Sequence, residues 1–276
     1  MAQSKRAATA GQFHYYSQER YPLLEMTSEL SDFQIQPILD IASNRVCGGE
    51  VLWRPNGQPL TRDLLTDLSE DPILNIDVSI GCFVFALTAL SRIQSDVWLS
   101  INLNTKYLSN GASFFKALSK RISDLDAAQK KAGKRLVIEL SECDITTESG
   151  LILLERLSQT HSLAIDDFGA GHAPLTHMLR VDFDKIKIDK SIVSGCDSDP
   201  KKQRFLNWLV GGSHSIDVTV CAEGVETESE LSYLRRIDID MGQGYLWAKS
   251  LPLDEFESLA IPIQAAAKTL GQAIKV

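Results

Sequence analysis

Residues 162–189 read SLAIDDFGAGHAPLTHMLRVDFDKIKID, and this stretch contains two short β-like runs that each end in an acidic side chain. The first run, Ser162–Ile165, leads into Asp166, and the second run, Asp184–Ile188, leads into Asp189. The segment between the runs is long enough to hold a helix, as two parallel strands require. The pattern predicts an α/β protein whose acidic residues collect at one edge of a sheet.

The same alternation of strands and longer segments continues on both sides of this stretch. The candidate strands are Phe33–Leu39, Val46–Trp53, Val97–Leu103, Arg135–Leu140, Ser162–Ile165, Asp184–Ile188, Asp217–Ala222 and Gly242–Leu246. Only Asp40–Arg45 separates the first two, and a turn of hairpin length predicts an antiparallel pair. The order of elements predicts an α/β fold, a modified TIM-type (βα)8 barrel with one antiparallel strand. Pattern alone leaves a doubly wound open sheet as the competing arrangement.

Three of the intervening segments have helical patterns. Leu151–Thr160 places leucines along one side and charged residues on another, and Ser113–Leu125 and Gln203–Val210 read similarly. The polar segments Asp124–Lys134 and Gly195–Lys202 are expected to be exposed loops. We expect residues 1–31 to form an N-terminal extension, residues 32–262 the barrel, and residues 263–276 a C-terminal tail.

Composition restricts the classes of function. The chain has 276 residues, of which 44% are hydrophobic, and a net charge of −8. An acidic chain lacks the basic footprint of a nucleic-acid-binding protein, so no DNA or RNA partner is expected. No run approaches the roughly 20 apolar residues of a membrane span. The N-terminus lacks the apolar centre of a signal peptide. The five cysteines are scattered without a CxxC pair, which favours a reduced, cytoplasmic protein.

The chemistry collects where the strands end. The acidic, amide and lysine residues at these positions are Glu50, Asn102, Glu139, Asp166, Asp167, Lys187, Glu223 and Gln243. A barrel gathers the C-terminal ends of its strands on one face, where barrel enzymes place their active sites. Hard oxygen ligands in this number are typical of Mg²⁺ or Mn²⁺ sites, and two such ions can activate water for phosphodiester hydrolysis.

Each of these residues also has a plain structural interpretation. A single carboxylate at a strand end is more often a helix cap or a salt-bridge partner than a metal ligand. Lys187 alternates with Ile186 and Ile188, which a solvated lysine would also do. The histidines and cysteines have no spacing that indicates a metal or redox site. The recurrence of one chemistry at several strand ends favours a shared site.

The chain resembles the EAL-domain family of cyclic di-GMP phosphodiesterases across about residues 33–252. The matching segments occur in the family's order: Glu50-Val51-Leu52-Trp53-Arg54, Ile101-Asn102-Leu103, Glu139-Leu140-Ser141-Glu142, Asp166-Asp167-Phe168-Gly169, Lys187-Ile188-Asp189, Ala222-Glu223-Gly224-Val225-Glu226-Thr227 and Gln243-Gly244-Tyr245-Leu246. The implied activity is metal-dependent hydrolysis of cyclic di-GMP to linear pGpG. This reaction would lower the level of the second messenger and so regulate motility and biofilm behaviour.

The resemblance also implies roles for individual residues. Two ions, Mg²⁺ or Mn²⁺, would be held by Glu50, Asn102, Glu139, Asp166, Asp167 and Glu223, and Ca²⁺ would inhibit. Glu50, Lys187, Glu223 and Gln243 would be catalytic, with Lys187 orienting the attacking water or the phosphate. Substrate contacts would come from Gln36, Leu52, Trp53, Arg54, Asp167, Lys187, Glu226 and Tyr245. Glu142 would anchor the loop after Asp167.

Departures from the family pattern leave alternatives open. Val51 replaces an alanine of the signature, and Ala170–Pro174 differs from the usual threonine, glycine, tyrosine and serine loop. The main alternative is a catalytically weak or inactive cyclic di-GMP receptor that acts through protein partners. The others are an interaction protein and a different metal-dependent phosphohydrolase. The family dimerises through the segment Gly169–Leu179, so a homodimer is expected, and a sensory domain or partner could supply the input signal.

Overall fold

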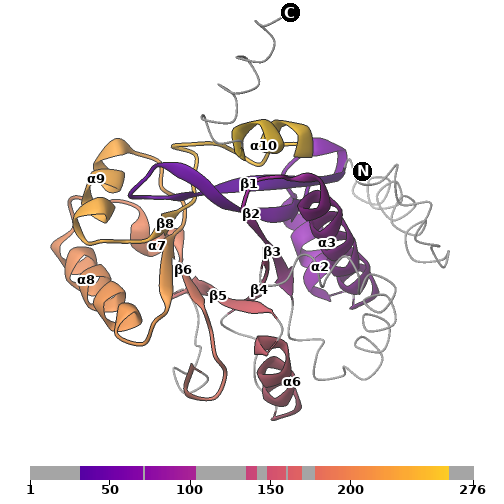
Figure 1. Ribbon diagram of the computed structural model, residues 1–276, viewed down its shortest axis with the longest axis horizontal. Helices are drawn as coiled ribbons and strands as arrows, with labels where there is room; N and C mark the ends of the chain where they lie inside the picture. The colour runs from indigo at the N-terminus through magenta and orange to yellow at the C-terminus, as the bar shows by residue number, and fades with distance from the viewer. Residues whose placement is uncertain are drawn as a thin grey trace, which may run out of the picture.

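The computed structural model describes residues 32–70, 72–103, 135–141, 148–159, 161–169 and 178–260, which form a closed barrel surrounded by helices (Figure 1). The strands follow one another around the barrel in chain order. Their bounds are β1 Phe33–Asp40, β2 Arg45–Trp53, β3 Trp98–Leu103, β4 Leu136–Ser141, β5 Ser162–Phe168, β6 Lys185–Ile188, β7 Thr219–Ala222 and β8 Met241–Gly242. The predicted barrel is confirmed, and the open sheet is excluded.

Strand β1 is the one strand that runs against its neighbours. It pairs antiparallel with both β2 and β8, whereas the pairs from β2 to β8 are parallel. In the tight turn between β1 and β2, the Ser43 N–H donates to Asp40 Oδ1 at 2.7 Å. Asn44 has a φ of 54°, a left-handed conformation that asparagine tolerates. The short turn thus reverses the chain as its length predicted.

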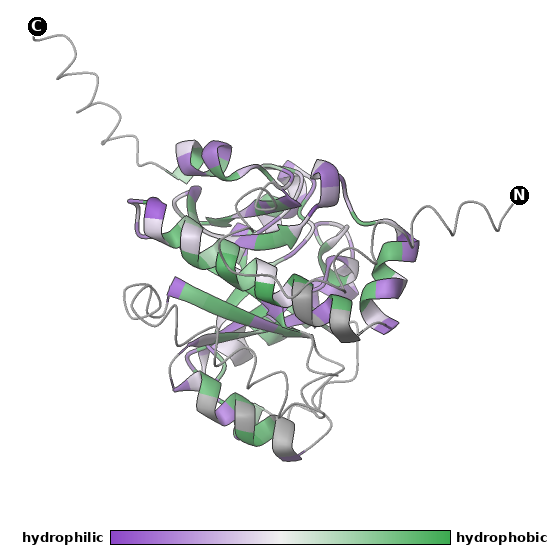
Figure 2. Cartoon of the chain, turned by 90° about the vertical axis from the view of Figure 1, so that its right-hand side faces the viewer, coloured by the Kyte–Doolittle hydropathy of each residue, from purple (hydrophilic) through white to green (hydrophobic). Residues whose placement is uncertain are grey.

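Helices cover the outside of the barrel (Figure 1). Their bounds are α2 Arg62–Glu70, α3 Pro72–Arg92, α6 Glu148–Ser158, α7 Lys190–Val193, α8 Pro200–His214, α9 Glu228–Arg236 and α10 Leu253–Ala260, with a short 3-10 helix η3 Pro55–Gly57. Figure 2 shows hydrophobic residues (green) beside hydrophilic ones (purple) on the helices, as expected where one side is buried. None of the helices in the described ranges combines the length and hydropathy that a membrane crossing requires.

Alternation along β2 separates the barrel interior from the layer beneath the helices. Val51 is 1% exposed and belongs to a hydrophobic cluster with Phe85 of α3 and Phe256 of α10. Glu50, its neighbour, faces the opposite way, because successive strand residues point to opposite faces. The bulkier Val51 of the signature is therefore accommodated in the outer layer and does not enter the site.

The segment 195–202 is only in part the loop that its polar composition predicted. Helix α8 begins at Pro200, and the side chain of Asp199 caps it by accepting from Lys201 N at 2.7 Å and Lys202 N at 3.4 Å. An N-cap aspartate followed by proline at the first helical position is a strong helix start, which outweighed the polar character of the segment. Helix α6, predicted over Leu151–Thr160, begins earlier, at Glu148.

Strand β8 is much shorter than the predicted Gly242–Leu246. Beyond Gly242 the chain turns and bonds to the loop after β7: Val225 N donates to Gln243 O, and Leu246 N donates to Val225 O, each at 3.1 Å. A Cβ atom at Gly244 would lie 2.1 Å from Val225 O, so the close approach of the two backbones requires glycine there. Residues 243–246 therefore bond to the loop after β7 and do not continue strand β8.

Several sequence predictions lie outside the described residues. These are the helix Ser113–Leu125, the loop Asp124–Lys134, the N-terminal extension 1–31 and the C-terminal tail 263–276.

Two glycine substitutions test the close packing of Gly244. Gly244→Ala places a methyl group against rigid backbone, and we expect it to lower the free energy of unfolding by about 1–3 kcal/mol or more. Gly211→Ala is the matched control, because this exposed position in α8 has nothing within 4 Å of an added Cβ. It should stabilise the protein by roughly 0.5–1 kcal/mol through helix propensity. Urea unfolding measures both, and equal effects would contradict the backbone contact.

Candidate functional site

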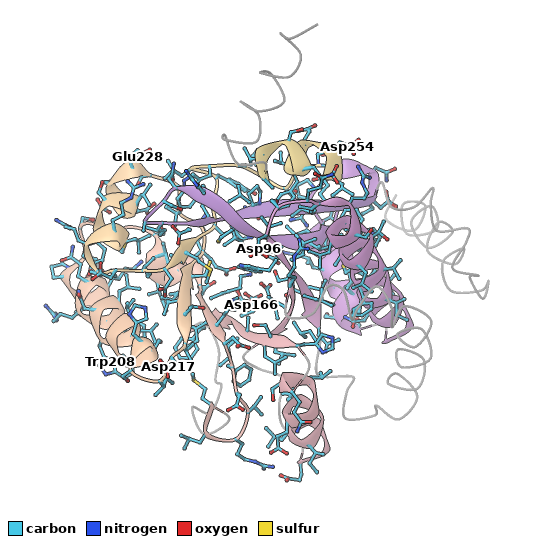
Figure 3. The ribbon with its side chains drawn as sticks, in the orientation of Figure 1. Asp96, Asp166, Trp208, Asp217, Glu228 and Asp254 are labelled. Atoms are coloured by element: carbon cyan, nitrogen blue, oxygen red, sulfur yellow. The ribbon has the colours of Figure 1, made fainter. Side chains whose placement is uncertain are left out.

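Polar side chains from several strands meet inside the barrel. Glu50 lies on β2, Glu139 on β4 and Lys187 on β6, and their exposed fractions are 7%, 1% and 2%. Asp166 of β5 lies near the middle of the barrel in Figure 3, and Glu223 directly follows β7. The structure therefore brings together side chains that the sequence placed at the ends of separate strands.

The ammonium group of Lys187 is the centre of this group. Its Nζ lies 3.1 Å from Glu50 Oε2 and 2.9 Å from Glu139 Oε2. It also lies 3.1 Å from Asp166 Oδ1 and 2.7 Å from Glu223 Oε1. Buried ion pairs at such distances interact far more strongly than solvent-exposed pairs. The interpretation of Lys187 as a solvated side chain is wrong.

Two amide side chains hold Glu50 in place. Asn102 Nδ2 donates to Glu50 Oε1, and Gln243 Nε2 donates to Glu50 Oε2, each at 2.7 Å. With Lys187 as a third donor to Glu50, both carboxylate oxygens are occupied. The amide nitrogens point to Glu50, so the oxygen atoms of Asn102 and Gln243 remain available to other partners.

The carboxylates outnumber the lysine that they surround. Four carboxylates and one ammonium leave an excess of three negative charges when all are ionised. Burial raises the pKa of Glu223 to about 8, and the nearby Asp166 and Glu50 charges add to this effect. Burial, with Glu50 and Asp166, likewise raises the pKa of Glu139 well above its usual range. The site thus holds protons at neutral pH unless another cation replaces them.

Glu50 and Lys187 favour their charged forms despite burial. Burial would raise the pKa of Glu50, but Lys187 and the amides of Gln243 and Asn102 lower it below its usual range. Burial would lower the pKa of Lys187, but the surrounding carboxylates raise it well above its usual range. The surroundings thus favour the charged forms of Glu50 and Lys187 and favour protonation of Glu139 and Glu223.

Asp166, Asp167 and Glu223 form a compact acidic triad at the edge of the cluster. Each offers a carboxylate oxygen, and these oxygens lie within 4.8 Å of one another. Asp167 has a φ of 53°, an uncommon conformation for a residue with a side chain, which turns it away from the strand pattern. Burial, with the Asp166 and Asp189 charges, raises the pKa of Asp167 to about 6.

The donor set fits divalent cations. Its members are carboxylate and amide oxygens, the ligands that Mg²⁺ and Mn²⁺ prefer. Within the described part of this cluster, Glu139 Oε1 and Gln243 Oε1 are buried and accept no hydrogen bond, and Asp166 Oδ1 has only its ion pair with Lys187. Buried polar atoms without partners are costly, and a bound cation would satisfy them. The excess negative charge and the unpartnered oxygens both favour a bound divalent cation.

Three residues expected to contact substrate lie around this cluster. Gln36 pairs in register with Glu50 across the β1–β2 ladder, and its Nε2 donates to Ala248 O at 3.4 Å. Arg54 is half-buried, and burial lowers its pKa while Glu50 and Tyr245 oppose that shift. Tyr245 is 60% exposed, and the Nζ atom of Lys249 lies 5.3 Å from the centre of its ring.

Other expected contacts lie farther from the interior or outside the described residues. Trp53 is buried in the hydrophobic layer under α3, on the same side of β2 as Val51, whereas Leu52 shares the side of Glu50. Glu226 is exposed at the rim and forms an ion pair with Lys190. Glu142 and most of the predicted dimer segment, residues 170–177, are outside the described residues.

Two contributors were missed from the sequence. Ser100 is fully buried, its hydroxyl group donates to Gly49 O at 3.5 Å, and its presence lowers the pKa of Glu139 against the effect of burial. It stands two residues before Asn102, and the period of two along a strand could have revealed it. Glu230 is 4% exposed and accepts hydrogen bonds from backbone groups near the site. Its sequence signal, a threonine three residues before a glutamate, indicated only a helix start.

Comparisons with known proteins match this chain to one family. The family model described as "EAL domain" matches residues 26–250, more than half of the chain. "Probable cyclic di-GMP phosphodiesterase PdeD" of Escherichia coli (strain K12) is 27% identical over 231 residues, which cover 80% of this chain and 42% of PdeD. The chain thus spans less than half the length of this relative.

Solved structures of Klebsiella pneumoniae BlrP1 have the same fold. Its complex described as "pH 8.0 calcium/cy-diGMP" is 27% identical with a TM-score of 0.68, and it covers 80% of this chain and 55% of the BlrP1 chain. The complex described as "pH 6 manganese/cy-diGMP" is 25% identical with the same TM-score, and it covers 80% and 56%. Both complexes therefore combine a divalent cation and cyclic di-GMP on this type of barrel.

The charge excess predicts that removing one carboxylate stabilises the metal-free protein at alkaline pH. The raised pKa of Glu223 means that its stabilising contribution is present below about pH 4.5 and is lost as pH rises through about 8. The Glu223→Gln variant has no ionisable group at this position. In EDTA, it should therefore melt at least about 2 °C above the wild type at pH 8.5, roughly 1 kcal/mol for a domain of this size. The difference should shrink toward pH 6.

Glu255→Gln is the control for this experiment. Glu255 is an exposed carboxylate on α10, so its replacement should leave a difference in melting temperature that does not change over this pH range. A Glu223→Gln protein that is less stable than the wild type at pH 8.5 would contradict the assigned charge excess.

Proposed function

This chain belongs to the EAL domain family, and we propose that it is a metal-dependent phosphodiesterase that hydrolyses cyclic di-GMP to linear pGpG. The observation that carries the proposal is the buried Lys187 with four carboxylates around it. An excess of buried oxygen anions beside a fixed cation suits a site that binds divalent ions and a phosphodiester. The names of PdeD and of the BlrP1 complexes support this choice of substrate.

Two divalent ions would be held by the acidic cluster. Glu50, Asn102, Glu139 and Asp166 would hold the first, and Asp166, Asp167 and Glu223 would hold the second. When bound, the ions would lower the pKa of a water molecule and neutralise charge on the phosphate. The raised pKa values of Glu139 and Glu223 imply that these residues release protons when the ions bind, so we expect tighter binding as pH rises.

Lys187 would stabilise the charge that develops during the reaction. Its ammonium group now faces carboxylates, and with metal ions bound it would be available to an attacking water or to the scissile phosphate. A fixed cation in a buried site costs little reorganisation when negative charge grows beside it. Its contribution should therefore be greater in the transition state than in the bound ground state.

Gln243 and Asn102 would keep Glu50 in position. Both amides donate to Glu50 at 2.7 Å, which fixes the carboxylate on the two sides. Fixing a metal ligand through such hydrogen bonds preserves the geometry of the site. At the rim, Arg54 would bind a substrate phosphate, and Gln36 and Tyr245 would contact the dinucleotide.

Incubation with cyclic di-GMP tests the proposal. With Mg²⁺ or Mn²⁺, chromatography should show conversion to pGpG, whereas Ca²⁺ should permit binding without cleavage because its coordination is longer and looser. Glu50→Gln should abolish turnover, and Glu255→Gln, at an exposed position of α10, should turn over as the wild type does. Tight binding by the wild type without cleavage in either metal would favour the alternative, a receptor that acts through protein partners.

Lys187→Met separates transition-state stabilisation from binding. We expect turnover to fall by about 10²-fold or more, as loss of a fixed charge contact typically causes, with a much smaller change in substrate affinity. Arg54→Met should instead weaken binding. Circular dichroism in Mn²⁺ should confirm that both variants fold. Wild-type turnover by a folded Lys187→Met protein would remove Lys187 from the mechanism.

A further inference from the structure

Helix α7 lies between the two segments that carry the acidic triad. On one side it contacts the end of β5: Asp189, its N-cap residue, donates from its backbone N–H to Phe168 O at 3.3 Å. A Cβ atom at Gly169 would lie 2.3 Å from Cδ1 of Ile192, so the helix packs directly on the backbone after Asp167. The position of α7 is thereby linked to Asp166 and Asp167.

On its other side, α7 contacts the loop that begins with Glu223. Gly224 has a φ of 64°, and a Cβ atom there would lie 2.5 Å from Cγ of Lys190. Lys190 also forms an ion pair with Glu226, but these side chains are 55% and 46% exposed. An ion pair with this exposure contributes little, so it does not by itself fix the loop.

The buried carboxylate of Glu230 makes a second connection between α7 and this loop. Its Oε1 accepts from the N–H of Gly195, in the turn after α7, at 2.8 Å. Its Oε2 accepts from the N–H groups of Glu226 and Thr227, each at 3.0 Å. Glu230 is only 4% exposed, and hydrogen bonds to an ionised carboxylate are stronger than those between neutral groups.

We propose that Glu230 is a positioning residue for metal binding: by joining the turn after α7 to the Glu223 loop, it sets the spacing of Asp166, Asp167 and Glu223. This inference rests on the proposed metal-dependent function. Asp166 and Asp167 lie on β5, whereas Glu223 follows β7, so the 4.8 Å spacing of their oxygen atoms depends on how the Glu223 loop is held relative to β5 and α7. Residues that orient metal ligands commonly change metal affinity when they are replaced.

Glu230 also belongs to the capping box of α9, and this purely structural role must be separated from positioning. Thr227 Oγ1 accepts from Glu230 N at 3.2 Å, which is the other half of the box. Thr227→Ala removes this half of the cap and leaves the Glu230 bond to Gly195. Glu230→Gln instead keeps the helix cap and removes the bond to Gly195. The amide oxygen can still accept from the backbone at the start of α9, whereas the amide NH₂ group cannot accept from the Gly195 N–H.

The test measures Mn²⁺ binding by isothermal titration calorimetry on the full chain, without substrate, together with the melting temperature in EDTA. Both variants should melt below the wild type. Glu230→Gln should raise the Mn²⁺ dissociation constant by about 10-fold or more, the typical effect of removing a group that orients metal ligands. Thr227→Ala should stay within roughly 3-fold of the wild type, since the ligands keep their orientation.

Equal Mn²⁺ affinity of Glu230→Gln and Thr227→Ala would overturn the inference and leave Glu230 as a helix cap. A wild type that neither binds Mn²⁺ nor cleaves cyclic di-GMP would instead overturn the proposed function. Amide hydrogen exchange of Gly195 in the wild type provides a test without variants. Slow exchange is expected for this partly buried hydrogen bond to Glu230, and exchange at the rate of an unprotected amide would overturn the connection.

Discussion

The structure depends on one buried cation that several strands share. Lys187 of β6 lies within 3.1 Å of carboxylates that follow or belong to β2, β4, β5 and β7. Isolated charges would be too costly in a barrel interior, and pairing offsets much of that cost. The compensation is incomplete, since the acids outnumber the lysine. Protonation, metal binding and stability are therefore coupled through the same few side chains.

Local sequence patterns predicted most of the barrel. Strand ends, the reversal at Asp40–Arg45 and the inward direction of Lys187 all follow from periods of two and from turn length. The strand ends also predicted that the acids and Lys187 share one site. Their direct contact with the ammonium group could not be predicted, because a single strand carries no information about the register of strands on the other side of a barrel. Trp53 is a separate case: it lies in the outer hydrophobic layer with Val51, whereas the family resemblance implies a substrate contact, which stays a prediction.

Elements near the site differed from prediction where hydrogen bonds between loops decide the conformation. Strand β8 ends at Gly242 because Gln243 and Leu246 bond to Val225, a residue distant in sequence. The sequence pattern of residues 242–246 does not indicate that their backbone will bond to Val225, although the glycine at position 244 is consistent with a close backbone approach. By contrast, Asp199-Pro200 is a sequence pattern typical of a helix start, but the polar composition of residues 195–202 led to the prediction of a loop.

Buried carboxylates have two opposite roles in this protein. Glu230 accepts from three backbone N–H groups, and although burial opposes ionisation, these bonds lower its pKa below the usual range. Glu223 has too few partners, and its pKa is raised to about 8. In a cluster of the second kind, Lys187 offsets the negative charge only in part, and protons or a further cation must compensate the rest. In the positioning role proposed for it, Glu230 lies outside this cluster and, with all its hydrogen bonds satisfied, fixes the loop that carries Glu223.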